Sequence, residues 1–233
     1  MSSFVTLLMK ETKALFTSTI AYVLIAVFLL LMGYTFTAFL FISRTATLVQ
    51  AVFQASMILL LIVPVITMRL FAEERRAGTL ELLLTSPVRE AEVVVAKFLA
   101  SMSVIVVMLA LTLAYPITLQ IFGQPDWGPV YSSYLGLILL AGALVSIGLA
   151  ISALTSNQIV AATLSLGVFL LMWMLDSLGS LLPDPYDIFV VNMSLTAHFT
   201  PFATGAMYLS DVGFFSTLIL LGLLFSVRAL ARR

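Results

Sequence analysis

Charged side chains, the groups best able to do chemistry, are concentrated in one segment of this chain. Charged residues make up only 9% of its 233 residues, yet ten of the 22 lie between Arg69 and Lys97. Gly78 permits a sharp turn, after which Thr79 can cap a short helix whose first turn holds Glu81. The leucines of that helix, rimmed by charge, would form a surface for a partner protein. A loop that only anchors two membrane spans is the alternative that these residues leave open.

Groups typical of catalysis are scarce in the rest of the sequence. His198 is the only histidine, no Gly-x-Ser-x-Gly sequence accompanies it, and the chain has no cysteine. The aspartates are scattered, whereas a metal site requires clustered ligands. Lys10, Lys13 and Lys97 all lie outside the Gly-x-x-x-x-Gly-Lys-Ser/Thr pattern that cradles ATP phosphates. We therefore expect no catalytic, cofactor-binding or metal-binding residue, a structural role for His198, and Asp176 as the best candidate for a functional carboxylate near a span end.

The composition is that of a membrane protein. Hydrophobic residues make up 62% of the chain and the mean hydropathy is +1.17, and about 20 apolar residues cross a bilayer as a helix. The predicted fold class is an all-α membrane protein with one transmembrane domain over residues 1–233. We expect six spans, at residues 17–42, 48–70, 93–121, 131–154, 158–180 and 206–228. The sixth span must begin near Ala206 or hold Asp211 at the membrane interface.

The segments between the spans have distinct patterns. Residues 1–16 have helical spacing of apolar and polar side chains, which predicts a helix in the inner interface. Residues 72–90 form the charged cytoplasmic loop, and residues 181–205 are apolar enough to fold back into the outer interface as short helices. Pro64 and Pro116 should kink the second and third spans. Small residues recur every four positions in the fourth span, and we favour packing within the chain over a subunit interface as their explanation.

Basic residues indicate which side of the membrane each segment faces. All lysines and arginines except Arg44 fall on the side of the two termini and residues 72–90. The positive-inside bias therefore places both termini and this loop in the cytoplasm.

Two stretches resemble a known family. Residues 68–88, "MRLFAEERRAGTLELLLTSPV", resemble the segment after the second span in permeases of the ABC type-2 exporter superfamily, and most of all the branch named for the gliding-motility permease GldF. Residues 194–215, "SLTAHFTPFATGAMYLSDVGFF", are similar to a second pattern of that branch. The matching residues of this outer-loop motif are His198, Phe199, Phe202, Gly205 and Asp211.

The resemblance implies a transmembrane permease subunit of an ATP-binding-cassette exporter in the bacterial inner membrane. The implied partners are two cytoplasmic ATPase subunits, which hold the ATP and Mg, and a second permease copy or close paralogue that completes a dimer. An accessory extracytoplasmic protein and membrane lipid are further candidate partners. In this family residues 72–90 would be the coupling helix. The implied coupling residues are Glu73, Glu74, Arg75, Arg76, Gly78, Thr79, Leu80, Glu81 and Leu83.

Other functions remain as alternatives. An ATP-independent secondary transporter or channel usually carries ionisable groups within its spans, and here the spans are nearly free of charge. An intramembrane enzyme is less well supported, for the reasons given above. Because the net charge is zero, no nucleic-acid partner is indicated. The residues leave open the substrate, and whether the complex exports a substrate or transmits force to a partner protein.

Overall fold

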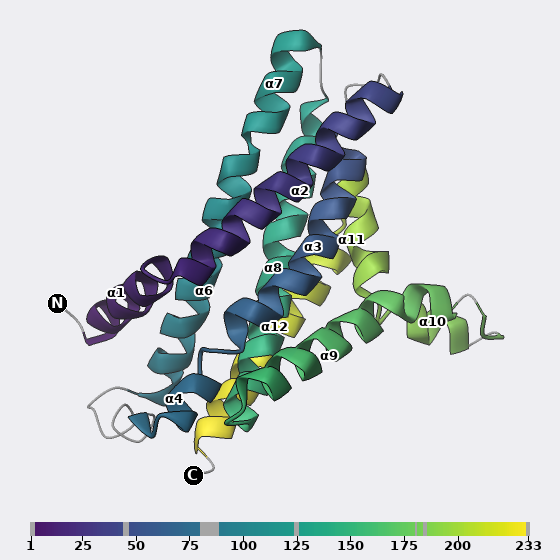
Figure 1. The fold of residues 1–233 in the computed structure, drawn as a ribbon. Helices are drawn as coiled ribbons and strands as arrows, with labels where there is room; N and C mark the ends of the chain where they lie inside the picture. The colour runs from purple at the N-terminus through teal and green to yellow at the C-terminus, as the bar shows by residue number, and fades with distance from the viewer. Residues whose placement is uncertain are drawn as a thin grey trace.

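The computed structural model describes residues 3–43, 47–79, 89–123, 126–179, 181–183 and 186–231. All regular secondary structure in these ranges is helical (Figure 1). The helices are α1 (Ser3–Phe16), α2 (Thr19–Ser43), α3 (Val49–Thr67), α4 (Ala72–Arg76), α6 (Glu90–Thr112), α7 (Ala114–Phe122), α8 (Trp127–Leu154), α9 (Gln158–Gly179), α10 (Tyr186–Val191), α11 (Leu195–Thr204) and α12 (Leu209–Ala231).

Six helical segments among the described residues are long and apolar enough to cross a membrane. They are Thr19–Ile42, Val49–Arg76, Glu90–Ile121, Trp127–Leu154, Gln158–Gly179 and Leu209–Ala231. This confirms the predicted all-α class and the six spans. Both chain termini and α4 lie at one end of the bundle, which we call the basic end, and α7 lies at the other (Figure 1). That the basic end faces the cytoplasm stays a prediction.

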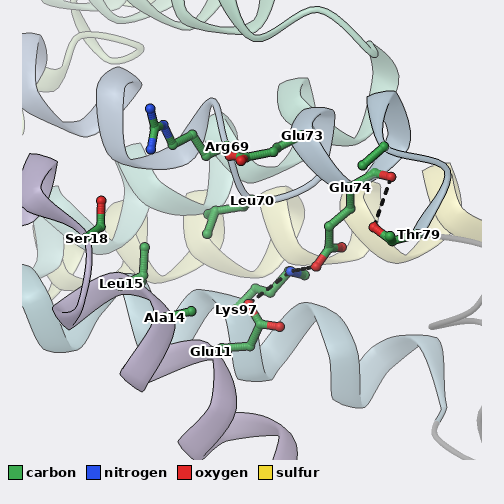
Figure 2. Close-up of a pocket in the computed structure, with 11 residues that line it drawn as sticks. Glu11, Ala14, Leu15, Ser18, Arg69, Leu70, Glu73, Glu74, Thr79 and Lys97 are labelled. Atoms are coloured by element: carbon green, nitrogen blue, oxygen red, sulfur yellow. Dashed lines mark hydrogen bonds and ion pairs between the residues drawn. The ribbon is translucent and has the colours of Figure 1, made fainter.

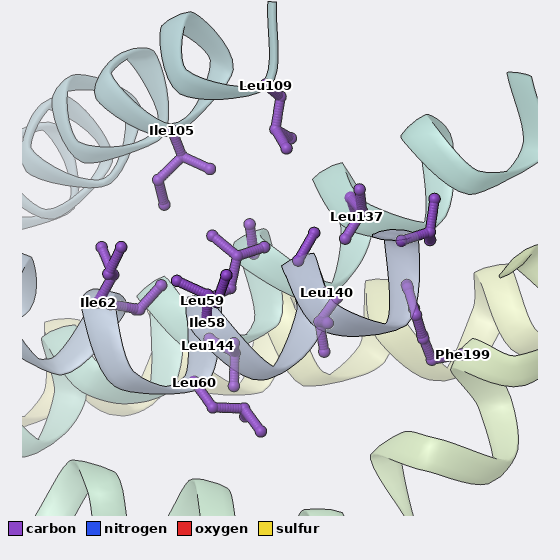
Figure 3. Close-up of a cluster of buried hydrophobic side chains, with 14 of the residues drawn as sticks. Ile58, Leu59, Leu60, Ile62, Ile105, Leu109, Leu137, Leu140, Leu144 and Phe199 are labelled. Atoms are coloured by element: carbon purple, nitrogen blue, oxygen red, sulfur yellow. The ribbon is translucent and has the colours of Figure 1, made fainter. Parts of the chain in front are cut away.

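Three spans form the centre of the bundle. About two-thirds of the most apolar stretch of α3 and of α8 is buried, and over half of that of α6, against 11% for α2. The core therefore lies between α3, α6 and α8, with α11 closing it, and α2, α9 and α12 lie outside (Figures 1 and 3). The central side chains labelled in Figure 3 are Ile58, Leu59, Leu60, Ile62, Ile105, Leu109, Leu137, Leu140, Leu144 and Phe199.

Small residues let α8 approach its neighbours closely, as small residues do in other membrane bundles. Gly148 faces Thr67 of α3, and Ser146 faces Gly222 of α12. A Cβ atom at Gly148 would lie 2.4 Å from the Thr67 hydroxyl oxygen. The recurring small residues of the fourth span therefore pack within the chain, as predicted.

Prolines have different effects in the second and third spans. Pro116 has no N–H to donate to the carbonyl of Thr112, and α6 ends at that residue before α7 begins at Ala114. The third span is thus interrupted at Leu113, near the proline where the sequence predicts a kink. By contrast, α3 continues through Pro64 to Thr67.

The segment between the fifth and sixth spans contains the predicted short helices, α10 and α11. Ser194 caps α11 by accepting hydrogen bonds from the backbone N–H groups of Thr196 and Ala197, and Gly205 ends it with a φ of 95°. That this segment folds back into the outer interface stays a prediction, and within the bundle α11 packs against the core. Its Phe199 and Phe202 side chains are fully buried in the core, because two phenylalanines one turn apart supply an apolar face that packs against α3, α8 and α9.

The contact between Gly222 and Ser146 yields a test of this packing. We expect Gly222→Ala to lower the free energy of unfolding by about 1–3 kcal/mol, because the new methyl group would lie 2.7 Å from the backbone carbon of Ser146. Gly213→Ala, in the same helix, meets no atom within 4 Å and is the matched control. Thermal unfolding in detergent measures both, and equal stability of the two variants would contradict the packing described.

Candidate functional site

A buried lysine organises the basic end of the molecule. Lys97 lies in the second turn of α6 and is 1% exposed. Its Nζ atom donates to Glu11 Oε2 at 3.0 Å and to Glu74 Oε1 at 2.7 Å (Figure 2). The same atom lies 5.3 Å from the centre of the Phe71 ring, within the range of a cation–π contact. One ammonium group therefore holds carboxylates from two other helices.

The partners of Lys97 come from distant parts of the chain. Glu11 lies on α1, and Glu74 lies on α4, the first part of the charged loop of residues 72–90. Around the three charges, a small apolar cluster joins the same elements through Leu7, Phe71 and Val94. The ion pairs and this cluster together tie α1 and α4 to α6.

A serine of α8 fixes the start of α4. The Ser152 hydroxyl accepts hydrogen bonds from the backbone N–H groups of Phe71 and Ala72, at 3.2 and 3.1 Å. It also donates to the carbonyl of Met68 at 3.3 Å. The turn between α3 and α4 is thus bound to the central helix of the bundle.

The structure places the predicted coupling residues as follows. Glu74 is partly buried against Lys97, while Glu73 and Arg76 are exposed and Arg75 is half-buried. Gly78 has a φ of 68°, as the predicted turn requires, and the Thr79 hydroxyl donates to the carbonyl of Glu74 at 3.3 Å. Leu80, Glu81 and Leu83, with the rest of residues 80–88, lie outside the described residues.

Sequence reasoning missed the central residues of this site. It placed Lys97 only among the basic residues of the inner side, and it did not single out Glu11. The available signal was a lone lysine within an apolar run and a glutamate on the partly apolar helix α1. Such charges need partners when buried, but the sequence does not name those partners.

A second charged pair lies toward the other end of the bundle. His198 Nδ1 is 2.7 Å from Asp211 Oδ1, and His198 Nε2 is 3.1 Å from the carbonyl oxygen of Asn192. The imidazole also stacks on the Phe214 ring at 4.0 Å. Both ring nitrogens face oxygen atoms, so the imidazole is oriented by contacts on both of its polar edges. The pair joins α11 to α12 and to the chain following α10.

The outer-loop motif of the sequence is therefore a packing unit. The helix α12 begins at Leu209, so Asp211 lies in its first turn. The Asp211 side chain is nearly buried, with 5% of the residue exposed. The sequence had indicated Asp176 as the best candidate for a partnered carboxylate. Within the described residues Asp176 makes no hydrogen bond or ion pair, whereas Asp211 is partnered by the histidine, so a functional role for Asp176 stays a prediction.

Removing the buried ammonium should destabilise the basic end. We expect Lys97→Met to lower the free energy of unfolding by about 3–5 kcal/mol, because Glu11 and Glu74 would then remain buried without a counter-charge. Adding Glu11→Gln should recover part of the loss. Lys10→Met, on the exposed face of α1, is the control, and chemical unfolding in detergent is the measurement. A Lys97 variant as stable as the control would show that the ion pairs contribute little.

Breaking the second pair should loosen α11. We expect Asp211→Ala to cost about 1–3 kcal/mol, because the His198 ring loses its partner in a mostly buried site. Faster amide hydrogen exchange in α11 would report the change. Asp176→Ala supplies the control, and an unchanged exchange rate in Asp211→Ala would argue against a role for the pair.

Comparison with protein families agrees with this architecture. Residues 5–183 match the family described as ABC-2 family transporter protein. No curated protein sequence matches the chain. The matched range covers most of the chain, from α1 through the fifth span, and includes Glu11, Glu74 and Lys97. The chain therefore belongs to the ABC-2 family of transporter membrane proteins, and it is a transmembrane permease of an ABC transporter.

Proposed function

We propose that this permease couples ATP hydrolysis by separate cytoplasmic subunits to export, or to mechanical work, across a bacterial inner membrane. In this proposal two ATPase subunits, carrying the ATP and Mg, bind residues 72–90. A second permease copy or close relative completes the path, and both termini face the cytoplasm. The motifs quoted above favour the GldF-like branch of the family, and an accessory extracytoplasmic protein is a further candidate partner.

The observation that carries the proposal is the position of Lys97. A force applied to residues 72–90 reaches α4 first, since α4 is the start of that segment. From Glu74 it passes through the buried ammonium to α6 and to α1. From the backbone of Phe71 and Ala72 it passes through Ser152 to α8. A displacement of the loop therefore moves three other helices.

The positions of the charged residues fit a transporter whose conformational change is driven by subunits outside the membrane. The described ion pairs join α6 to α1 and α4 at one end and α11 to α12 toward the other, and the described core between them contains no charged side chain. A secondary transporter would be expected to hold ionisable groups at mid-depth. This distribution favours the ATP-driven function over the ATP-independent alternative.

A mild-detergent pull-down from the native membrane tests the partner. We expect a soluble protein with a Gly-x-x-x-x-Gly-Lys-Ser/Thr loop to co-purify with the chain, and to be lost when residues 80–84 are replaced by serine. If no ATPase is bound under conditions that preserve other membrane complexes, the loop is an anchor and the proposal fails.

A second experiment tests the transmission itself, once the ATPase has been identified. Glu74→Gln keeps the side-chain shape but removes one charge facing Lys97. We expect the ATPase to remain bound while its permease-dependent activity falls by about fivefold or more, as for a lost coupling energy of 1–3 kcal/mol. Asp176→Asn, in α9 and outside residues 72–90, is the control. Wild-type activity in Glu74→Gln would exclude this route of coupling.

A further inference from the structure

The basic end contains a pocket whose charges are only partly used by the protein. Its volume is about 390 Å³, within the range of roughly 300–1,000 Å³ that is usual for ligand sites. Lys97, Glu11 and Glu74 line it and satisfy one another through two ion pairs (Figure 2). Arg69 and Glu73 line it as well, and neither makes an ion pair within the part of the chain that the structure describes.

The polar atoms of the pocket that lack hydrogen-bond partners belong to side chains of opposite charge. Arg69 Nε is buried without a hydrogen-bond partner among the described residues, and so is Glu74 Oε2. Figure 2 shows the guanidinium of Arg69 pointing away from Glu73 and Glu74, so the cation and the carboxylates do not neutralise each other. Within the described part of the chain, Arg69 lacks an acceptor, and Glu74 Oε2 and the Glu73 carboxylate lack a donor, so a ligand that carries both an anionic acceptor and a cationic N–H donor would satisfy all three.

An apolar crevice adjoins this pocket. The crevice lies where α1 meets α2, and it shares Leu15, Ser18 and Arg69 with the charged pocket. Its other walls are apolar side chains of membrane spans, among them Leu24 of α2 and Val104 of α6. The crevice has a volume of only about 30 Å³, so it does not enclose a ligand, but it places an apolar, span-lined surface directly beside the charged pocket. A charged pocket next to such a surface suits an amphiphile whose head is charged and whose tail is hydrocarbon.

We propose that this pocket binds the headgroup of a zwitterionic phospholipid with a primary ammonium, as in phosphatidylethanolamine. The guanidinium of Arg69 and the hydroxyl of Ser18 would donate hydrogen bonds to the phosphate. The ammonium would donate to Glu73 and to the free oxygen of Glu74. The acyl chains would begin along the crevice. The site does not require the proposed ATPase, so it can be tested on the purified chain alone.

Two other phospholipids test which part of the headgroup the pocket recognises. Phosphatidylcholine carries the same phosphate and positive charge, but its trimethylated nitrogen has no N–H to donate. Phosphatidylglycerol has the phosphate without a cation. We expect the full chain in detergent to retain dioleoyl phosphatidylethanolamine about tenfold more tightly than either of these lipids, measured by native mass spectrometry during lipid titration. Equal retention of the three lipids would overturn the proposal.

Variants assign the binding to this pocket. Arg69→Gln and Glu73→Gln should each weaken retention of phosphatidylethanolamine by about tenfold. Arg228→Gln and Glu90→Gln, which change the same residue types outside the pocket, should leave retention unaltered. If the two pocket variants bind like the two controls, the lipid is held elsewhere and the proposal fails.

A charge reversal distinguishes a lost site from a damaged fold. Glu73 is exposed, so Glu73→Arg keeps the core and the Lys97 ion pairs. It replaces the ammonium-binding carboxylate by a second cation, and it should shift the preference from phosphatidylethanolamine to phosphatidylglycerol. An unchanged preference would contradict the assigned role of Glu73. Competition by water-soluble glycerophosphoethanolamine as strong as that by the lipid would overturn the assignment to a membrane lipid.

Discussion

The buried ammonium of Lys97 is the interaction on which the basic end depends. Removing an ammonium from water costs several kcal/mol, and the cost is offset only where acceptors surround it in good geometry. Glu11 and Glu74 provide these acceptors from α1 and α4. The apolar contacts in the same region are non-directional and would tolerate several arrangements. The ion pairs allow far fewer arrangements of the helices, because both carboxylates must reach one nitrogen atom.

The centre of the molecule is held by a different constraint, the close approach of helix backbones. Gly148 against Thr67 and Ser146 against Gly222 leave no room for a further methyl group. Close-packed interiors transmit displacement, since neighbouring side chains have no space to absorb it. Ser152 extends this rigid unit from α8 to the start of α4. The start of the charged loop at α4 is therefore bound to the core, as coupling by the proposed mechanism requires.

A largely buried pair of ionisable side chains joins helices toward both ends of the bundle. At the basic end a cation of α6 holds carboxylates of α1 and α4, and toward the other end His198 of α11 holds Asp211 of α12. In both places a short helix is joined to a long span by a largely buried pair. Within the described residues the core between them consists of apolar side chains and small polar groups, several of which, such as Thr67 and Ser146, donate to backbone carbonyls. The charges thus lie where short helices must be positioned.

Sequence alone determined the features that depend on neighbouring residues. Hydropathy runs predicted the six spans, glycine predicted the turn at Gly78, and the apolar segment before Asp211 predicted short helices. These properties are local, because a helix forms and enters a membrane according to the residues within a few turns. Tertiary structure decided which charges are paired: Lys97 meets Glu11 across 86 positions and Glu74 across 23. It also selected Asp211 over Asp176, and it buried Phe199 and Phe202. Such choices depend on which helix faces meet in space, and hydrophobic spacing within one helix carries no information about the partner of a single charge.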